Sequence, residues 1–102
     1  MITHLTTETF DKFIAAMDKP VIVDYWAEWC QPCKQMLLVL NQIAEENSDY
    51  VIAKVNVDAE GSLAEGLSTI PTIKVYLSGR EVGRIVGAKP KAVLLDLLAD
   101  ML

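Results

Sequence analysis

Residues 23–34 read VDYWAEWCQPCK and join two patterns that together decide the fold. The run from Val21 to Tyr25 is β-branched and aromatic, which is typical of a buried strand. The residues after Cys30 have helical periodicity, and Pro32 suits a first helical turn because its missing N–H has no helical partner there. The sequence therefore predicts a strand that leads directly into a helix, with two cysteines at the junction.

Cys30 and Cys33 are spaced so that they can close or open a small disulfide, which makes them a candidate redox pair. Cys30 would stand at the helix N-terminus, where free amides and the helix dipole stabilise a thiolate. We therefore expect Cys30 to be the nucleophile and Cys33, one turn later, to be the resolving thiol. The alternative is a zinc or iron–sulfur site, but such sites need about four ligands, and the chain offers only one other candidate, the distant His4.

The composition describes one domain, residues 1–102, with 52% hydrophobic residues and a net charge of -5. This acidic balance argues against nucleic acid as a partner, because phosphate binding needs a basic surface. The longest aliphatic run, residues 36–40, is too short to cross a membrane. The first ten residues, MITHLTTETF, lack the features of a secretory signal, so we expect a cytoplasmic protein.

The periodicities predict alternating strands and helices. Strands are expected at residues 2–5, 21–26, 50–57, 72–77 and 81–86, and helices after Thr6 or Thr7, from the cysteine pair to about Asn47, within 62–67, and from Pro90. Gly79 marks a hairpin turn between the last two strands. This order favours an α/β protein with a mixed sheet and helices on both faces.

The segment VDYWAEWCQPCK resembles the active-site segment of the thioredoxin family, whose usual form has Gly at the position of Gln31. Four further segments match the family in the same order: AKVNVD (residues 53–58), IPT (70–72), SGRE (78–81) and VGA (86–88). The resemblance covers nearly the whole chain. It implies a thioredoxin fold, with a central mixed five-stranded sheet flanked by four helices, the third of them shortened.

This resemblance also implies a protein disulfide reductase that exchanges dithiols for disulfides in electron transport and cell redox homeostasis. It implies a thioredoxin reductase as the partner that recharges it, disulfide-containing proteins as substrates, no bound cofactor, and a monomer. Two other functions stay open: a thioredoxin-fold binding or chaperone module, and a more oxidising disulfide oxidase or isomerase.

Two charged residues gain a role from the resemblance. Strand alternation places Asp24 on the same face as Ile22 and Trp26, where burial is costly for a carboxylate. In the family the matching aspartate takes up the proton of the resolving cysteine, and the residue matching Lys54 pairs with it. Asp24 could instead be a strand-end aspartate bound to a loop amide, and Lys54 an ordinary solvated lysine.

The resemblance further implies an apolar rim around the cysteines that binds the substrate. It consists of Trp29, Ile70, Pro71, Gly87 and Ala88, beside Pro32 in the active-site turn. The bond between Ile70 and Pro71 is expected to be cis, with the Ile70 backbone facing an extended substrate strand. Gly87 is equally compatible with a plain turn glycine.

The sequence departs from the family pattern at several places. Gln31, between the cysteines, is expected to shift the reduction potential, together with Pro32. Leu38 occupies a position where the family commonly has a kinking proline, which predicts a straighter helix. The segment from Asp58 to Pro71 is about two residues short, which predicts a third helix of about one turn. The last helix has no capping side chain before Pro90, so its start is expected to fray.

Overall fold

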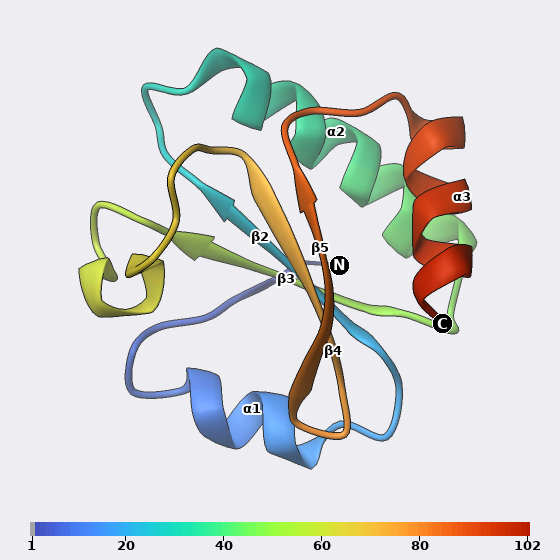
Figure 1. The fold of residues 1–102 in the computed structure, drawn as a ribbon, viewed down its shortest axis with the longest axis horizontal. Coiled ribbons are helices and arrows are strands. Elements are labelled where there is room, and N and C mark those ends of the chain that lie inside the picture. Colours follow the sequence, from blue (N-terminus) through green and yellow to red (C-terminus); the bar gives the residue numbers. More distant parts are fainter. Residues whose placement is uncertain (1) are drawn as a thin grey trace.

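A computed structural model of the chain, describing residues 2–102, contains one sheet with helices on both faces (Figure 1). The described residues form five strands, three α-helices and one short 3-10 helix. In chain order these are β1 (Thr3–His4), α1 (Phe10–Ala16), β2 (Val21–Trp26), α2 (Gln31–Glu46), β3 (Val51–Asn56), η1 (Gly61–Ala64), β4 (Thr72–Leu77), β5 (Arg80–Val86) and α3 (Lys91–Met101).

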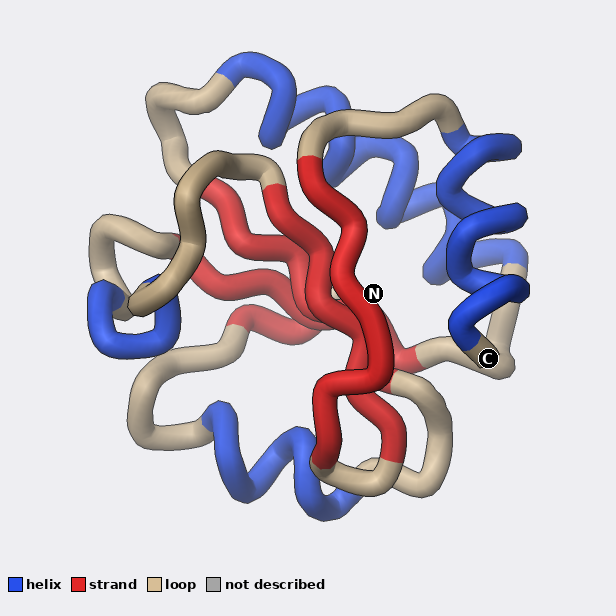
Figure 2. Tube along the Cα trace, viewed as in Figure 1, coloured by secondary structure: helices blue, strands red, loops and turns tan. Residues whose placement is uncertain are grey.

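The strands follow the order β1-β3-β2-β4-β5, and β2 occupies the centre (Figure 2). β1 and β2 pair with β3 in parallel, whereas β4 pairs antiparallel with both β2 and β5. All six residues of β2 are buried, because the strand has neighbours on both edges and helices on both faces. The mixed five-stranded sheet expected from the resemblance is confirmed.

The two faces of the sheet have separate apolar cores. On one face Phe10 and Ile14 of α1 pack against alternate residues of β2, including Val23 and Tyr25. On the other face α2 and α3 lie together over Ile22 (Figure 1). The helical stripes account for this: α2 contributes Met36, Leu40 and Ile43, and α3 contributes Leu94 and Leu98.

The hairpin between β4 and β5 turns through Ser78 and Gly79, whose φ angles are 55° and 82°. Positive φ at both central residues is the geometry that matches strand twist in a two-residue hairpin. The predicted glycine turn is therefore confirmed, with β5 beginning one residue earlier than expected, at Arg80.

Three details of the prediction need correction. Within residues 2–102 the sheet has three α-helices rather than four, and the expected short third helix is the 3-10 turn η1. Helix α1 begins at Phe10, so neither Thr6 nor Thr7 caps it. The Thr6 hydroxyl instead accepts from the Thr9 N–H, at 3.3 Å, in the preceding turn.

Other predictions on the helices have different outcomes. Pro90 precedes α3 without a side-chain cap, as predicted. Helix α2 is continuous past Leu38, but whether it is straighter than its relatives stays a prediction. No helix among residues 2–102 is long and apolar enough to span a membrane.

Candidate active site

Cys30 and Cys33 form a disulfide at the start of α2, with their Cα atoms 5.3 Å apart. Cys30 is the N-cap residue, and Pro32 lies in the first helical turn, where its ring fits the required φ. The Cys33 N–H points at the Cys30 Sγ, at 3.3 Å. Cys30 keeps 5% of its surface exposed, whereas Cys33 has none. Only the Cys30 side chain is therefore accessible from solvent, whereas the Cys33 side chain is covered by the protein.

The loop before β4 passes directly beside this disulfide. Its Ile70–Pro71 bond is cis, as the resemblance implies. The Ile70 carbonyl oxygen lies 4.0 Å from the Cys30 Sγ, but a disulfide sulfur has no hydrogen to donate, so in this state the contact is only a close approach. The Gly87 N–H donates to the Pro71 carbonyl at 2.8 Å. This bond ties the end of β5 to the loop and so brings together three of the predicted rim residues.

Gly87 has a φ of 89°, which lies in the region where a side chain is strained. The glycine is therefore required by the turn itself, whatever its part in substrate binding. Ala88, the next residue, lines a pocket of about 310 Å³, together with Gln35, Met36, Val39, Lys89 and Pro90. Ala88 does not line the groove described below, to which Ile70 contributes.

Trp29 projects from the turn before Cys30, with 70% of its surface exposed. Its indole N–H donates to Asp58 Oδ2 at 2.8 Å. The Asp58 loop is itself fixed, because the backbone N–H groups of Asp58 and Ala59 donate to the Asn56 side-chain oxygen at 3.0 and 3.2 Å. These hydrogen bonds thus hold the exposed Trp29 ring in place at the surface, one residue before Cys30.

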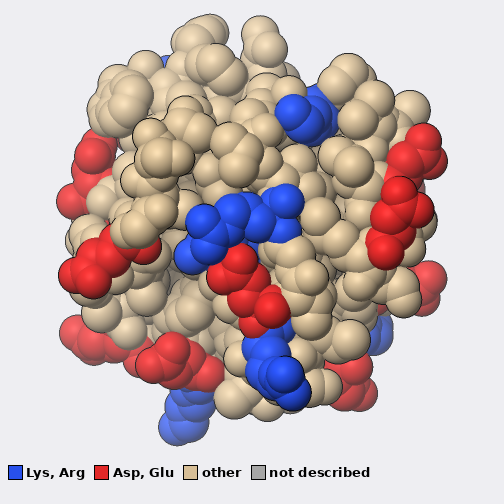
Figure 3. All heavy atoms as spheres, viewed as in Figure 1, with Lys and Arg blue, Asp and Glu red and all other residues tan. Residues whose placement is uncertain are grey.

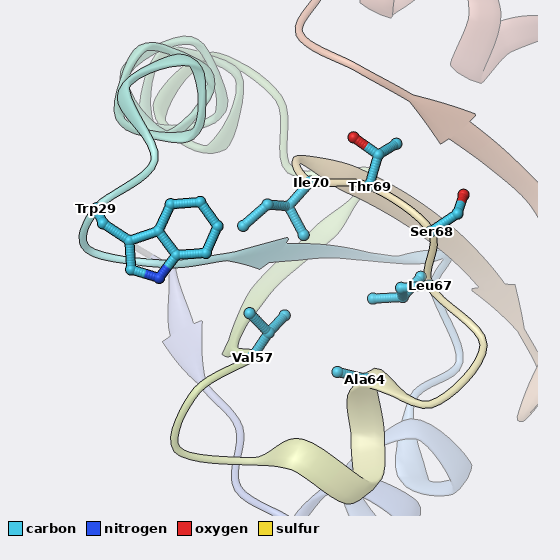
Figure 4. Close-up of a pocket in the computed structure, with 7 residues that line it drawn as sticks. All are labelled: Trp29, Val57, Ala64, Leu67, Ser68, Thr69 and Ile70. Carbon is cyan, nitrogen blue, oxygen red and sulfur yellow. The ribbon is translucent and has the colours of Figure 1, made fainter.

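A groove of about 460 Å³ opens between the Trp29 ring and the chain that follows β3 (Figure 4). Val57, Ala64 and Leu67 point into it, whereas the Ser68 and Thr69 side chains point away. Ile70 also lines the groove, and its carbonyl oxygen is the atom that approaches the Cys30 Sγ. Its volume falls in the range of about 300–1,000 Å³ that is usual for ligand pockets. The groove is therefore mainly apolar, and one of its lining residues, Ile70, lies next to the Cys30 sulfur.

Asp24 is fully buried on β2, and both of its carboxylate oxygens lack a hydrogen-bond partner among residues 2–102. Burial raises the pKa of this carboxyl from 3.8 to about 7, although the positive charge of Lys54 acts in the opposite direction. Strand alternation places Asp24 on the face of Ile22 and Trp26. Ile22 packs against α2 and Trp26 packs with Cys33, so Asp24 lies on the face that carries the resolving cysteine.

Lys54 lies opposite Asp24 in the β2–β3 register. Its ammonium group is centred over the Trp26 ring, 5.1 Å from the ring centroid. Among residues 2–102 it forms no ion pair within 4.0 Å of a carboxylate, so the pairing expected from the resemblance is electrostatic rather than a direct contact. Lys54 is half-buried, so part of its side chain is covered by the protein.

The cysteine pair, Asp24, Lys54 and the rim were predicted from the sequence, whereas part of the groove was not. Asp58 was not assigned a role, although an acidic residue just after a strand that runs beside the active-site strand is a signal for such a contact. Val57, Ala64 and Leu67 were also missed, because their convergence depends on the path of η1. Gln31 is exposed, and nothing in its surroundings decides its effect on the potential.

Comparison with known proteins agrees with this arrangement. A family model described as Thioredoxin matches residues 1–100. A thioredoxin of Streptomyces clavuligerus is 43% identical over 97 residues, covering 93% of this chain and 91% of that protein. One of Alicyclobacillus acidocaldarius subsp. acidocaldarius is 44% identical over 101 residues, covering 96% and 95%. A bifunctional thioredoxin reductase/thioredoxin of Mycobacterium leprae is 41% identical over 101 residues, which cover 96% of this chain and 22% of that protein.

Proposed function

Since the chain belongs to the thioredoxin family and is a protein disulfide reductase, we propose that its reaction runs through Cys30 as nucleophile and Cys33 as resolving thiol. The Cys30 thiolate attacks one sulfur of a client disulfide, and the other client sulfur leaves as a thiolate. Cys33 then loses its proton and attacks the Cys30 sulfur, which releases the second client thiolate. Two electrons pass to the client, and the Cys30–Cys33 disulfide remains. The unequal exposure of the two cysteines is the observation that supports this assignment.

In this proposal Asp24 accepts the proton that Cys33 gives up. A buried carboxyl whose pKa is raised to about 7 suits this task, because a base is most effective when its pKa lies near the working pH. Lys54 keeps the pKa of Asp24 from rising further, and so adjusts the base rather than contacting the client.

The client segment binds across the rim in extended form. Among residues 2–102 the Ile70 N–H donates to no protein acceptor, so it is free to pair with a client backbone beside Cys30. Trp29, Pro71, Gly87 and Ala88 supply apolar contact or close approach on either side of that strand.

Recharging of the disulfide by a thioredoxin reductase follows from the same proposal. The relative that joins both functions in its name, from Mycobacterium leprae, supports such a partner. The protein would work as a cytoplasmic monomer in electron transport, without a bound cofactor, on disulfide-containing proteins.

Insulin reduction in the presence of dithiothreitol tests this function. The wild-type protein should accelerate precipitation of the insulin chains, and Cys30→Ser should abolish the effect. Cys33→Ser should instead accumulate a mixed disulfide, because it can attack but cannot resolve. Full activity of Cys30→Ser would indicate a binding module, and a reduction potential far above the roughly -270 mV of a typical reductase would indicate an oxidase or isomerase.

A second test addresses the nucleophile directly. In the reduced protein at neutral pH, iodoacetamide should label Cys30 faster than an ordinary peptide cysteine, because only a thiolate reacts. Equal rates would overturn the assignment of Cys30.

A further inference from the structure

We propose that the groove beside Trp29 selects clients whose disulfide is flanked by an apolar side chain and then by basic residues. The inference rests on the proposed function and names the class of substrate for the same site. It combines two features of the described residues, an apolar groove and the charges that surround it.

The groove can hold the apolar side chain. Trp29, Val57, Ala64, Leu67 and Ile70 supply its walls, and Ile70 is also the residue closest to the Cys30 sulfur. A client strand paired with Ile70 would therefore place a neighbouring side chain in the groove, because alternate side chains of a strand point to the same face. η1 is a single turn without buried residues, and its last residue, Ala64, lines the groove.

The chain segment from residue 57 to residue 70, which forms most of the groove, carries negative charge and no positive charge. Residues 57–70 contain Asp58, Glu60 and Glu65 but no Lys, Arg or His. Glu28 adds a fourth carboxylate next to Trp29. The basic residue nearest to the disulfide in sequence, Lys34, lies on α2 and does not line the groove.

Three of these carboxylates directly neighbour a wall residue in the chain: Glu28 precedes Trp29, Asp58 follows Val57, and Glu65 follows Ala64. All three are exposed, and Glu28 and Glu65 form no ion pair within residues 2–102. Acidic side chains are visible over the η1 segment on the left of Figure 3. A basic client segment that leaves the groove would meet this charge, whereas an acidic one would be repelled.

Matched peptides test both features. Each has the disulfide-closed loop Cys-Gly-Gly-Cys followed by Leu-Lys-Lys, Leu-Glu-Glu or Ser-Lys-Lys, and reduction by the dithiol protein is followed by acid quench and chromatography. At low salt we expect the Leu-Lys-Lys peptide to react about tenfold faster than the Leu-Glu-Glu peptide, and several-fold faster than the Ser-Lys-Lys peptide. At ~0.5 M salt the first ratio should fall to about two.

The net charge of the protein, -5, would by itself attract basic peptides, so the variants must separate local from global charge. Glu65→Gln and Glu28→Gln should each reduce the preference for Leu-Lys-Lys over Leu-Glu-Glu by about twofold. Glu45→Gln is the matched control: it removes one exposed carboxylate from α2, about 21 Å along the helix from its start, and should leave the preference unchanged.

Each result decides a different point. Equal rates for the three peptides would overturn the inference but leave the reductase function intact. An equal loss of preference in Glu45→Gln and Glu65→Gln would also overturn it, because the selection would then come from the global field. Reduction of none of the peptides, together with no reduction of insulin, would instead overturn the proposed function.

Discussion

Lys54 lies opposite Asp24 in the parallel pair of β2 and β3, yet its ammonium group sits over the Trp26 ring rather than on the carboxylate. The buried carboxyl therefore receives a long-range attraction without a hydrogen bond from its neighbour. The pKa of Asp24 stays raised because burial raises it by more than the positive charge of Lys54 lowers it.

Asp24→Asn should stabilise the oxidised protein above pH 7. At pH values below the unfolded-state pKa of about 3.8 the carboxyl is protonated in both states, so it has no effect on stability. As the pH rises toward 7, the unfolded chain releases the proton and the folded chain keeps it, which favours unfolding. A pKa raised from 3.8 to about 7 corresponds to roughly 4 kcal/mol lost from the free energy of unfolding.

Urea denaturation at several pH values measures this effect. Asp24→Asn should gain about 2–4 kcal/mol at pH 8 and almost nothing near pH 4. Asp96→Asn, the same substitution at an exposed site on α3, should keep the wild-type pH dependence. A wild-type free energy of unfolding that does not decline between pH 4 and 7 would contradict the raised pKa.

Lys54→Met should raise the pKa of Asp24 further, above 7, because it removes the one cation among residues 2–102 that lowers this pKa. The Asp24 carboxyl carbon can be titrated directly by NMR in the oxidised protein. Lys74→Met is the control, because Lys74 also lies over an aromatic ring, that of Tyr25 at 5.2 Å, but is not among the groups that act on Asp24. A common shift in both variants would show that net charge, and not position, is responsible.

Much of this site is readable from sequence because it depends on local patterns. Strand alternation is enough to bury Asp24, and the proline after Cys30 is enough to start α2 at the cysteine pair. The groove is different, since its walls come from three separate segments whose meeting depends on long-range packing. The position of Lys54 is equally hidden, because a flexible side chain can reach either the carboxylate or the Trp26 ring, and sequence spacing does not decide between them.

Trp29→Ala should weaken the reduction of protein disulfides far more than it weakens the fold. The ring is 70% exposed, so its loss should cost less than about 1 kcal/mol of stability. As the principal wall of the groove it should act as an anchor for clients, and we expect kcat/KM for insulin to fall about tenfold. Asp58→Ala should cause a smaller loss of the same kind, since it frees the indole without removing it.

Leu38→Ala provides the comparison for Trp29→Ala. Leu38 is similarly exposed, at 66%, but lies on α2 outside the groove. It should leave kcat/KM for insulin within about twofold of wild type. A tenfold loss here as well would mean that exposed apolar surface in general, and not the groove, binds the client.

Gly83→Ala should destabilise the protein through its contact with α3. A Cβ at Gly83 would overlap the Met101 Sδ and approach its Cγ to 2.9 Å, so the Met101 side chain would have to leave its place against β5. Overpacking of this kind costs about 1–3 kcal/mol, and the flexibility of methionine favours the lower end.

In a Met101→Ala background the added methyl group finds room, so the same Gly83→Ala substitution should be nearly neutral. Urea denaturation of the four proteins gives the coupling directly, and we expect about 1 kcal/mol. Gly61→Ala is the control, because no atom of the described residues lies within 4 Å of the added Cβ, and the stability of the protein should change little. An equal cost of Gly83→Ala with and without the Met101 side chain would show that the glycine is required by the strand backbone, and not by the packing of α3 against β5.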